Sequence, residues 1–108
     1  MLLDVDEAIQ TFINNLSRKI ALECIIIFGS TARGNRLAES DVDLIVISND
    51  FINMPLNERF RIVYSAWPPY IDADIIPLTK EEFENILKKS VILRDAQKYW
   101  RIIRTKNK

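Results

Sequence analysis

The predicted fold is centred on residues 28–47, FGSTARGNRLAESDVDLIVI. An apolar run, ECIIIF (residues 23–28), stops at Gly29, and a second run, VDLIVIS (residues 42–48), follows a polar segment. Short apolar runs that are rich in β-branched residues and end at glycine or polar residues are typical of buried strands. We therefore predict two core strands joined by a loop rich in glycine, hydroxyl groups and charges.

Two amphipathic helices are predicted outside this pair of strands. Apolar residues recur at helical spacing over residues 5 to about 20, and again from near Pro55 to Trp67. Proline suits the first turn of a helix, and Pro68 followed by Pro69 ends the second one. Trp67 lies on the apolar face of that helix, so we expect it in the core.

A third strand and a third helix follow. YIDADIIPL, residues 70–78, alternates well enough for a strand. Thr79 and Glu82 have the spacing of a capping box, which predicts a helix over residues 80–89. This order of elements implies a small mixed β-sheet flanked by helices. The fold class is α/β or α+β, and the sequence does not separate the two.

The end of the chain is ambiguous. SVIL, residues 90–93, suits either a short strand or the start of a helix. After Arg94, apolar residues including Trp100 recur at helical spacing, so we predict a helical tail. We expect residues from about 95 to 108 to be frayed or to form an interface.

Composition restricts the chemistry. The chain of 108 residues fits a single domain over residues 1–108. It has 15 basic and 15 acidic residues and no histidine, which excludes histidine-based triads and zinc sites with histidine ligands. The one cysteine, Cys24, lies in an apolar run and is expected to be a buried, inert thiol. Acid–base and metal chemistry must therefore fall to carboxylates.

The sequence also lacks the signals of secretion and membrane insertion. The first ten residues, MLLDVDEAIQ, are acidic and helical rather than basic and then apolar, unlike a signal peptide. The apolar runs reach about five residues, far fewer than a membrane span needs. We expect a soluble cytoplasmic protein with no membrane association, and no feature indicates a nucleic-acid surface.

Asp41 and Asp43 lie two residues apart where the second strand begins, so both side chains point to the same side. Two carboxylates on one face repel each other unless a cation lies between them. Mg²⁺ is the usual cation, because it prefers oxygen ligands and often binds one or two carboxylates together with phosphate oxygens. The alternative is that both aspartates belong to an ordinary turn.

The beginning of the loop has the features of an anion site. Gly29 follows a buried strand, and Ser30 can cap a short helix that begins at STAR. Free backbone N–H groups at a helix start bind phosphate, and Ser30 and Arg33 can add direct hydrogen bonds. The alternative is a plain strand–turn–helix junction. The pattern matches neither a Walker A loop nor the dinucleotide-binding glycine motif.

Together, the Gly-Ser pair and the Asp-x-Asp pair resemble a known signature. GSTARG followed by SDVDL is similar to the motif of the DNA polymerase β-type nucleotidyltransferase superfamily, and the forms GSxARG and SDxDL resemble its minimal nucleotidyltransferase branch. The motif covers residues 28–47, and the order of elements is similar over about residues 5–90. The resemblance implies a polymerase β-like nucleotidyltransferase fold.

The family uses a third carboxylate on a later strand. Asp72 and Asp74 are the candidates on the third predicted strand, and because they are two residues apart, periodicity does not choose between them. In the family the third aspartate usually precedes apolar strand residues, as Asp74 does in ADIIPL. We select Asp74, and both could instead be surface residues of an edge strand.

The resemblance implies transfer of a nucleoside monophosphate, AMP from ATP, to an acceptor hydroxyl, with release of pyrophosphate. Asp41, Asp43 and Asp74 would be the catalytic residues and the ligands of two Mg²⁺ ions, and Asp74 could also accept the proton of the hydroxyl. Gly29 and Ser30 would hold the outgoing phosphates, with Arg33 assisting.

Partners are likewise implied by the resemblance. Minimal nucleotidyltransferases are often paired with a small helical HEPN protein in toxin–antitoxin systems, so the implied function is an antitoxin that adenylylates its toxin. Two alternatives remain open: an antitoxin that binds its partner without catalysis, and a nucleotidyltransferase acting on a small molecule. A homo-oligomer is also compatible with the apolar segment YWRII, residues 99–103.

Overall fold

The computed structural model describes residues 5–28, 42–97 and 100–104. The sheet contains β1 (Cys24–Phe28), β2 (Val42–Ile47), β3 (Ala73–Leu78) and β4 (Arg101–Arg104), in the order β3-β2-β1-β4. The helices are α1 (Val5–Ser17), α3 (Leu56–Ala66), α4 (Lys80–Lys89) and α5 (Val91–Ala96), with a 3₁₀ turn, η1, at Asn49–Phe51. The sheet is mixed, because β2 pairs parallel to β3 and β1 pairs antiparallel to both β2 and β4. The predicted small mixed sheet with flanking helices is confirmed.

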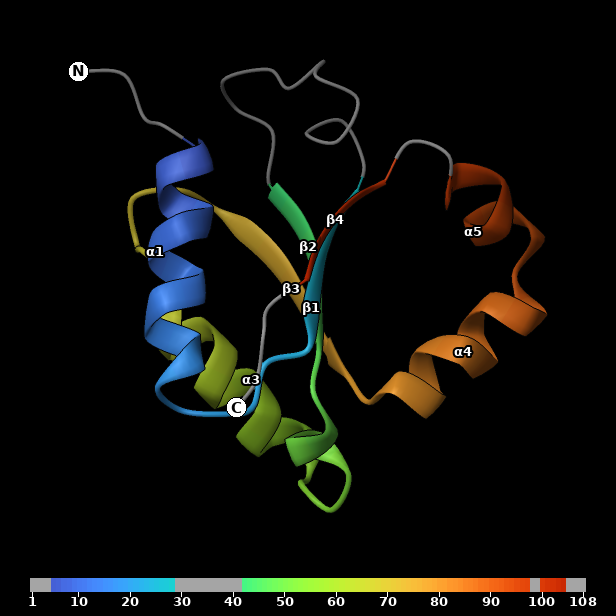
Figure 1. Cartoon of the computed structure of the whole chain (residues 1–108), viewed down its shortest axis with the longest axis horizontal. Helices are drawn as coiled ribbons and strands as arrows, with labels where there is room; N and C mark the ends of the chain where they lie inside the picture. The colour runs from blue at the N-terminus through green and yellow to red at the C-terminus, as the bar shows by residue number, and fades with distance from the viewer. Residues whose placement is uncertain (1–4, 29–41, 98–99, 105–108) are drawn as a thin grey trace.

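Helices cover both faces of the sheet. In Figure 1, α1 and α3 lie on one side of the strands, while α4 and α5 lie on the other side. The main core lies between the sheet and the first pair of helices, and it includes Phe12, Leu16, Ile25, Ile27, Leu44, Val46, Val63 and Ile75. Because β1 and β2 are covered on both faces, their sequences are apolar at nearly every position.

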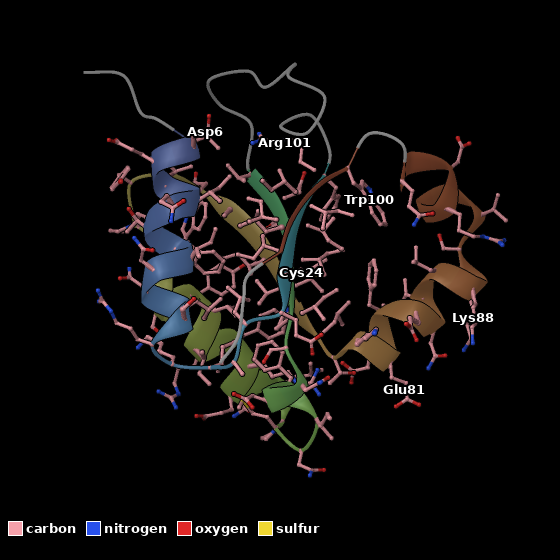
Figure 2. The ribbon with its side chains drawn as sticks, viewed as in Figure 1. Asp6, Cys24, Glu81, Lys88, Trp100 and Arg101 are labelled. Atoms are coloured by element: carbon pink, nitrogen blue, oxygen red, sulfur yellow. The ribbon has the colours of Figure 1, made fainter. Side chains whose placement is uncertain are left out.

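A second, smaller cluster occupies the face toward α4. It consists of Cys24, Ile26, Ile45 and Ile47, with Phe83 and Trp100 packed against it. The ring centroids of Phe83 and Trp100 are 5.8 Å apart. Cys24 is therefore buried as expected (Figure 2).

Local signals predicted several of these elements well. Thr79 caps α4 as a complete capping box: its side chain accepts a hydrogen bond from the Glu82 N–H at 3.1 Å, and its own N–H donates to the Glu82 carboxylate at 2.9 Å. Trp67 is buried at the end of α3, where its ring meets that of Phe12 edge to face at 5.2 Å. Both predictions are confirmed.

The predicted helical tail is wrong in its central part. Residues Arg101–Arg104 form β4, which pairs with β1, and SVIL leads into α5 rather than into a strand. Ile103 joins the main core while Trp100 packs against the second cluster, so side chains of this segment serve both faces of the sheet. In so short a segment, the spacing of the apolar residues is compatible with both a helix and a strand. Pairing with the edge of β1 makes it a strand.

Within the residues that the structure describes, every helix is too short or too polar to cross a bilayer.

Candidate functional site

The candidate site lies at the end of the sheet where β1 finishes and where β2 and β3 begin. Cα pairing aligns Phe28 of β1 with Asp43 of β2, and Asp43 with Asp74 of β3. Three neighbouring strands therefore place these residues in one row across the sheet. Neighbouring strands lie about 4.8 Å apart, so the two aspartates occupy adjacent positions.

Both carboxylates lie on the face of the sheet that carries the second cluster. Val42 and Leu44 belong to the main core, so Asp43 between them points to the opposite face. Ile75 also belongs to the main core, which places Asp74 on that same opposite face. Asp43 is half-buried and Asp74 is exposed, so a ligand in solvent can reach the pair.

Asp72, the other candidate from the sequence, lies just before β3. Its backbone carbonyl accepts a hydrogen bond from the Val42 N–H at 3.1 Å, which extends the pairing of β2 and β3 by one step. The side chain of Asp72 is exposed. Asp74 is the candidate that the strand register aligns with Asp43, whereas Asp72 precedes the strand. β3 is an outer strand of the described sheet. This position is also the one expected if Asp72 and Asp74 were simply surface residues of an edge strand.

The remaining predicted site residues, Gly29, Ser30, Arg33 and Asp41, lie outside the described residues. Asp41 is joined directly to Val42, the first residue of β2, and Gly29 directly to Phe28, the last residue of β1. The assignments of these residues as phosphate and metal ligands remain predictions.

The donor set fits a hard divalent cation. Carboxylate oxygens from neighbouring strands are ligands that Mg²⁺ prefers, and the ion ordinarily completes its shell with waters and phosphate oxygens. Among the residues that the structure describes, no three acidic, cysteine or histidine side chains come together as a possible metal site. The described part of the candidate metal site is the pair Asp43 and Asp74. The third expected ligand, Asp41, is among the residues not described.

One residue with a role at this site was missed by sequence reasoning. The Tyr64 hydroxyl of α3 donates to the Ala73 carbonyl at 3.3 Å and accepts from the Ile75 N–H at 3.0 Å. These two backbone groups flank Asp74, so Tyr64 holds the strand segment that carries the carboxylate. Tyr64 is 44% exposed on an amphipathic helix, and nothing in its spacing distinguishes it from a surface residue.

Comparison with known proteins identifies the family. The family described as "Nucleotidyltransferase domain" matches residues 9–107. This chain belongs to that family. The match covers nearly the whole chain, including all nine helices, turns and strands described above except the first turn of α1. A search among curated proteins found no match.

Solved structures extend this finding to the fold. The chain is similar to a candidate nucleotidyltransferase from Sulfolobus solfataricus, with a TM-score of 0.57 and 24% identity over 75% of this chain and 78% of that one. It also matches a structure described as a toxin-antitoxin with AMP-PNP, with a TM-score of 0.49 and 21% identity over 85% of this chain and 64% of that one. The first similarity confirms the α+β nucleotidyltransferase fold.

Proposed function

We propose that this nucleotidyltransferase domain transfers AMP from ATP to a hydroxyl group of a partner protein in a Mg²⁺-dependent reaction. The observation that carries the proposal is the alignment of Asp43 with Asp74 on one face of the sheet. Both lie next to the segment whose sequence holds the Gly-Ser and Asp-x-Asp pairs. Membership of the nucleotidyltransferase family supports the class of reaction.

Each site residue has a role that its chemistry suits. Asp41 and Asp43 would bind the metal ion on the triphosphate. Together with Asp74, they would also bind a second ion. When bound, Mg²⁺ neutralises phosphate charge and lowers the pKa of a coordinated hydroxyl. Asp74 would also accept the proton of the acceptor hydroxyl, because the chain has no histidine to do so.

The phosphate-binding roles complete this proposal. Gly29 would let the triphosphate approach the backbone, and Ser30 would donate hydrogen bonds to the β- and γ-phosphates. Arg33 would offset the negative charge that develops on the leaving pyrophosphate. In the transfer step, the acceptor oxygen forms a bond to the α-phosphorus, and the bond from the α-phosphorus to the oxygen bridging it to the β-phosphorus breaks. Pyrophosphate leaves, and the hydroxyl proton passes to Asp74.

The acceptor in this proposal is a small helical protein of the HEPN type, for which the domain acts as an antitoxin. This part rests on the resemblance of GSTARG and SDVDL to minimal nucleotidyltransferases.

The test is transfer of label from ATP. The full chain is incubated with α-labelled ATP, Mg²⁺ and the purified product of the adjacent gene, and label on that protein is measured. We expect label that EDTA abolishes and that Asp43→Asn reduces by at least about 100-fold, because metal ligands contribute several kcal/mol to such reactions. Circular dichroism should show an unchanged fold.

The outcomes separate the alternatives. Undiminished labelling by Asp43→Asn would contradict the metal assignment. A stable complex with the partner but no label at any metal concentration would favour an antitoxin that acts by binding alone. ATP binding, measured by calorimetry with and without EDTA, adds a readout that does not depend on the acceptor.

A further inference from the structure

Two aromatic residues lie in the same row across the sheet as the two aspartates. Phe28 of β1 is the Cα partner of Asp43. Trp100 directly precedes β4, which pairs antiparallel with β1, and continuing that register places Trp100 opposite Phe28. The row therefore runs across the end of the sheet from Trp100 through Phe28 and Asp43 to Asp74.

The four side chains of this row also share one face of the sheet. Phe28 and Trp100 pack against the second cluster, which lies on the face to which Asp43 and Asp74 point. Figure 2 shows Trp100 on the side of the sheet that faces α4 and α5. Both aromatic residues are half-buried, so part of each remains accessible to a ligand.

The spacing of the row suits a bound nucleotide. Neighbouring strands lie about 4.8 Å apart, so Phe28 is one strand and Trp100 two strands from Asp43, about 10 Å in all. In the proposed function, the acceptor hydroxyl would lie at Asp74 and the α-phosphate at the metal on Asp43. The ribose and base extend from that phosphate, and the aromatic half of the row lies beside Asp43 on the side away from the acceptor.

The Trp100 ring is supported by α4. Its centroid is 5.8 Å from that of Phe83, and the two ring planes are inclined at 45°. α4 itself is fixed at its start by the capping box of Thr79 and Glu82. A ring that is already held in place loses little freedom when a ligand stacks on it, which lowers the entropic cost of binding.

A cavity on the same face is the competing place for a base. It has a volume of about 710 Å³, and Ile26, Phe83 and Leu87 are among the residues that line it. Phe28 and Trp100 are not among its described lining residues. Ile26 lies two residues before Phe28, so the cavity begins about 7 Å farther along the strand from the carboxylates. The aromatic pair is therefore the nearer of the two surfaces.

We propose that Phe28 and Trp100 form the stacking surface for the base of the nucleoside triphosphate. This inference rests on the proposed function and adds the part of the site that selects the nucleotide. Stacking on aromatic side chains accepts every base, and its strength sets the modest preferences among bases. A purine has the larger ring system, so purine nucleotides should bind more tightly than pyrimidine nucleotides.

Binding of ATP, CTP and inorganic triphosphate tests the proposal. Each ligand is titrated into the full chain with Mg²⁺ and without acceptor, and binding is measured by calorimetry. We expect ATP to bind at least about tenfold more tightly than triphosphate, with CTP between them. Triphosphate carries more negative charge than ATP, so a site of phosphate and metal ligands alone would bind it at least as tightly. Equal affinities for ATP and triphosphate, or for ATP and CTP, would overturn the proposal.

Variants of Trp100 separate stacking from packing. Trp100→Leu should weaken ATP binding at least about tenfold, because leucine fills space but has no π-face, whereas Trp100→Phe should stay within about threefold. Neither variant should change the affinity for triphosphate, which also reports that the site is folded. Equal losses of ATP affinity in both variants would indicate a packing role and overturn the proposal.

Leu87→Trp is the matched control for the cavity. Leu87 is half-buried on α4 and lines the cavity, so a larger side chain there fills the space without touching the aromatic row. ATP affinity should stay unchanged in this variant. If Leu87→Trp weakens ATP binding and Trp100→Leu does not, the base occupies the cavity and the proposal is wrong.

Tryptophan fluorescence gives a direct readout. The chain has two tryptophans, and Trp67 lies in the main core on the opposite face of the sheet. ATP should therefore change the emission through Trp100, triphosphate should not, and Trp100→Phe should abolish the change. Emission that saturating ATP leaves unaltered would overturn the proposal, even if Trp100→Leu fails to fold.

The two proposals fail in different ways. Asp43→Asn should weaken ATP and triphosphate by the same factor, because it removes a metal ligand and leaves the aromatic pair intact. Preference for ATP without transfer of label would support the stacking surface and contradict the transfer reaction, and transfer without that preference would do the reverse. Absence of binding by both ligands at about 1 mM would overturn both proposals.

Discussion

Among the two candidate residues on and before β3, we propose Asp74 rather than Asp72 as the third carboxylate. It is exposed, lies in register with Asp43, and shares its face of the sheet. The neighbouring Asp72 is also exposed, but it precedes β3 and contributes a backbone carbonyl to the sheet. The two aspartates have the same charge and lie two residues apart, so they form a matched pair for mutagenesis.

We predict that Asp74→Asn reduces AMP transfer by at least about 100-fold, because the variant loses both a metal ligand and a proton acceptor. Asp72→Asn should retain transfer within about threefold. The measurement is the initial rate of label transfer from α-labelled ATP at saturating Mg²⁺. If instead Asp72→Asn loses transfer and Asp74→Asn retains it, Asp72 is the third carboxylate and the argument from strand register is wrong.

At the scale of elements, the position of β3 depends on α3. Tyr64 of α3 bonds two backbone groups of β3, and Arg59 of the same helix bonds the Pro77 carbonyl. These contacts replace the hydrogen bonds that a further strand would supply at this edge. They also restrain the strand that carries Asp74 relative to β2.

We predict that Tyr64→Phe lowers the free energy of unfolding by about 1 kcal/mol, because the ring remains while two backbone groups lose their partner. The Ile75 amide should exchange with deuterium faster, and transfer should fall less than it does in Asp74→Asn. Tyr70→Phe is the control, since Tyr70 is 52% exposed and outside this contact. An unchanged exchange rate at Ile75 would show that the hydroxyl does not hold the strand.

At the scale of the whole molecule, one ion pair joins the layers on opposite sides of the sheet. Arg59 is buried in α3, and its guanidinium bonds both carboxylate oxygens of Glu82 in α4, at 2.7 and 3.2 Å. The same side chain donates to the Met54 carbonyl at 2.9 Å and lies over the Phe51 ring. The hydrogen bond from Arg59 is the largest cause of the lowered pKa of Glu82, and bonds from Thr79 add to it against the effect of burial.

We predict that this ion pair makes stability depend on pH. The pKa of Glu82 lies below its ordinary value of 4.5 in the folded chain, so its contribution is present above about pH 4.5 and is lost as the pH falls through the folded-state pKa. Thermal unfolding of the unaltered chain and of Glu82→Gln should differ most near pH 6, and the difference should shrink toward pH 3. A difference that is constant over this range would contradict the prediction.

Interactions between residues close in the chain could be predicted from the sequence. The capping box of Thr79 and Glu82 needs only a spacing of three residues, and it forms with both hydrogen bonds. The double-sided burial of β1 and β2 follows from continuous apolar runs, and the burial of Trp67 follows from helical spacing. The motif in residues 28–47 also indicated the nucleotidyltransferase family, which the family match confirms.

Interactions between distant segments needed the tertiary structure. The end of the chain forms β4 because the edge of β1, more than 70 residues earlier, accepts its backbone, and no local spacing records that partner. Alternation places Asp72 and Asp74 alike, and only the register of β3 against β2 sets Asp74 beside Asp43. The bonds from Tyr64 and Arg59 to β3 arise in the same way, because hydrogen bonds between distant segments leave no periodic signal in the sequence that makes them.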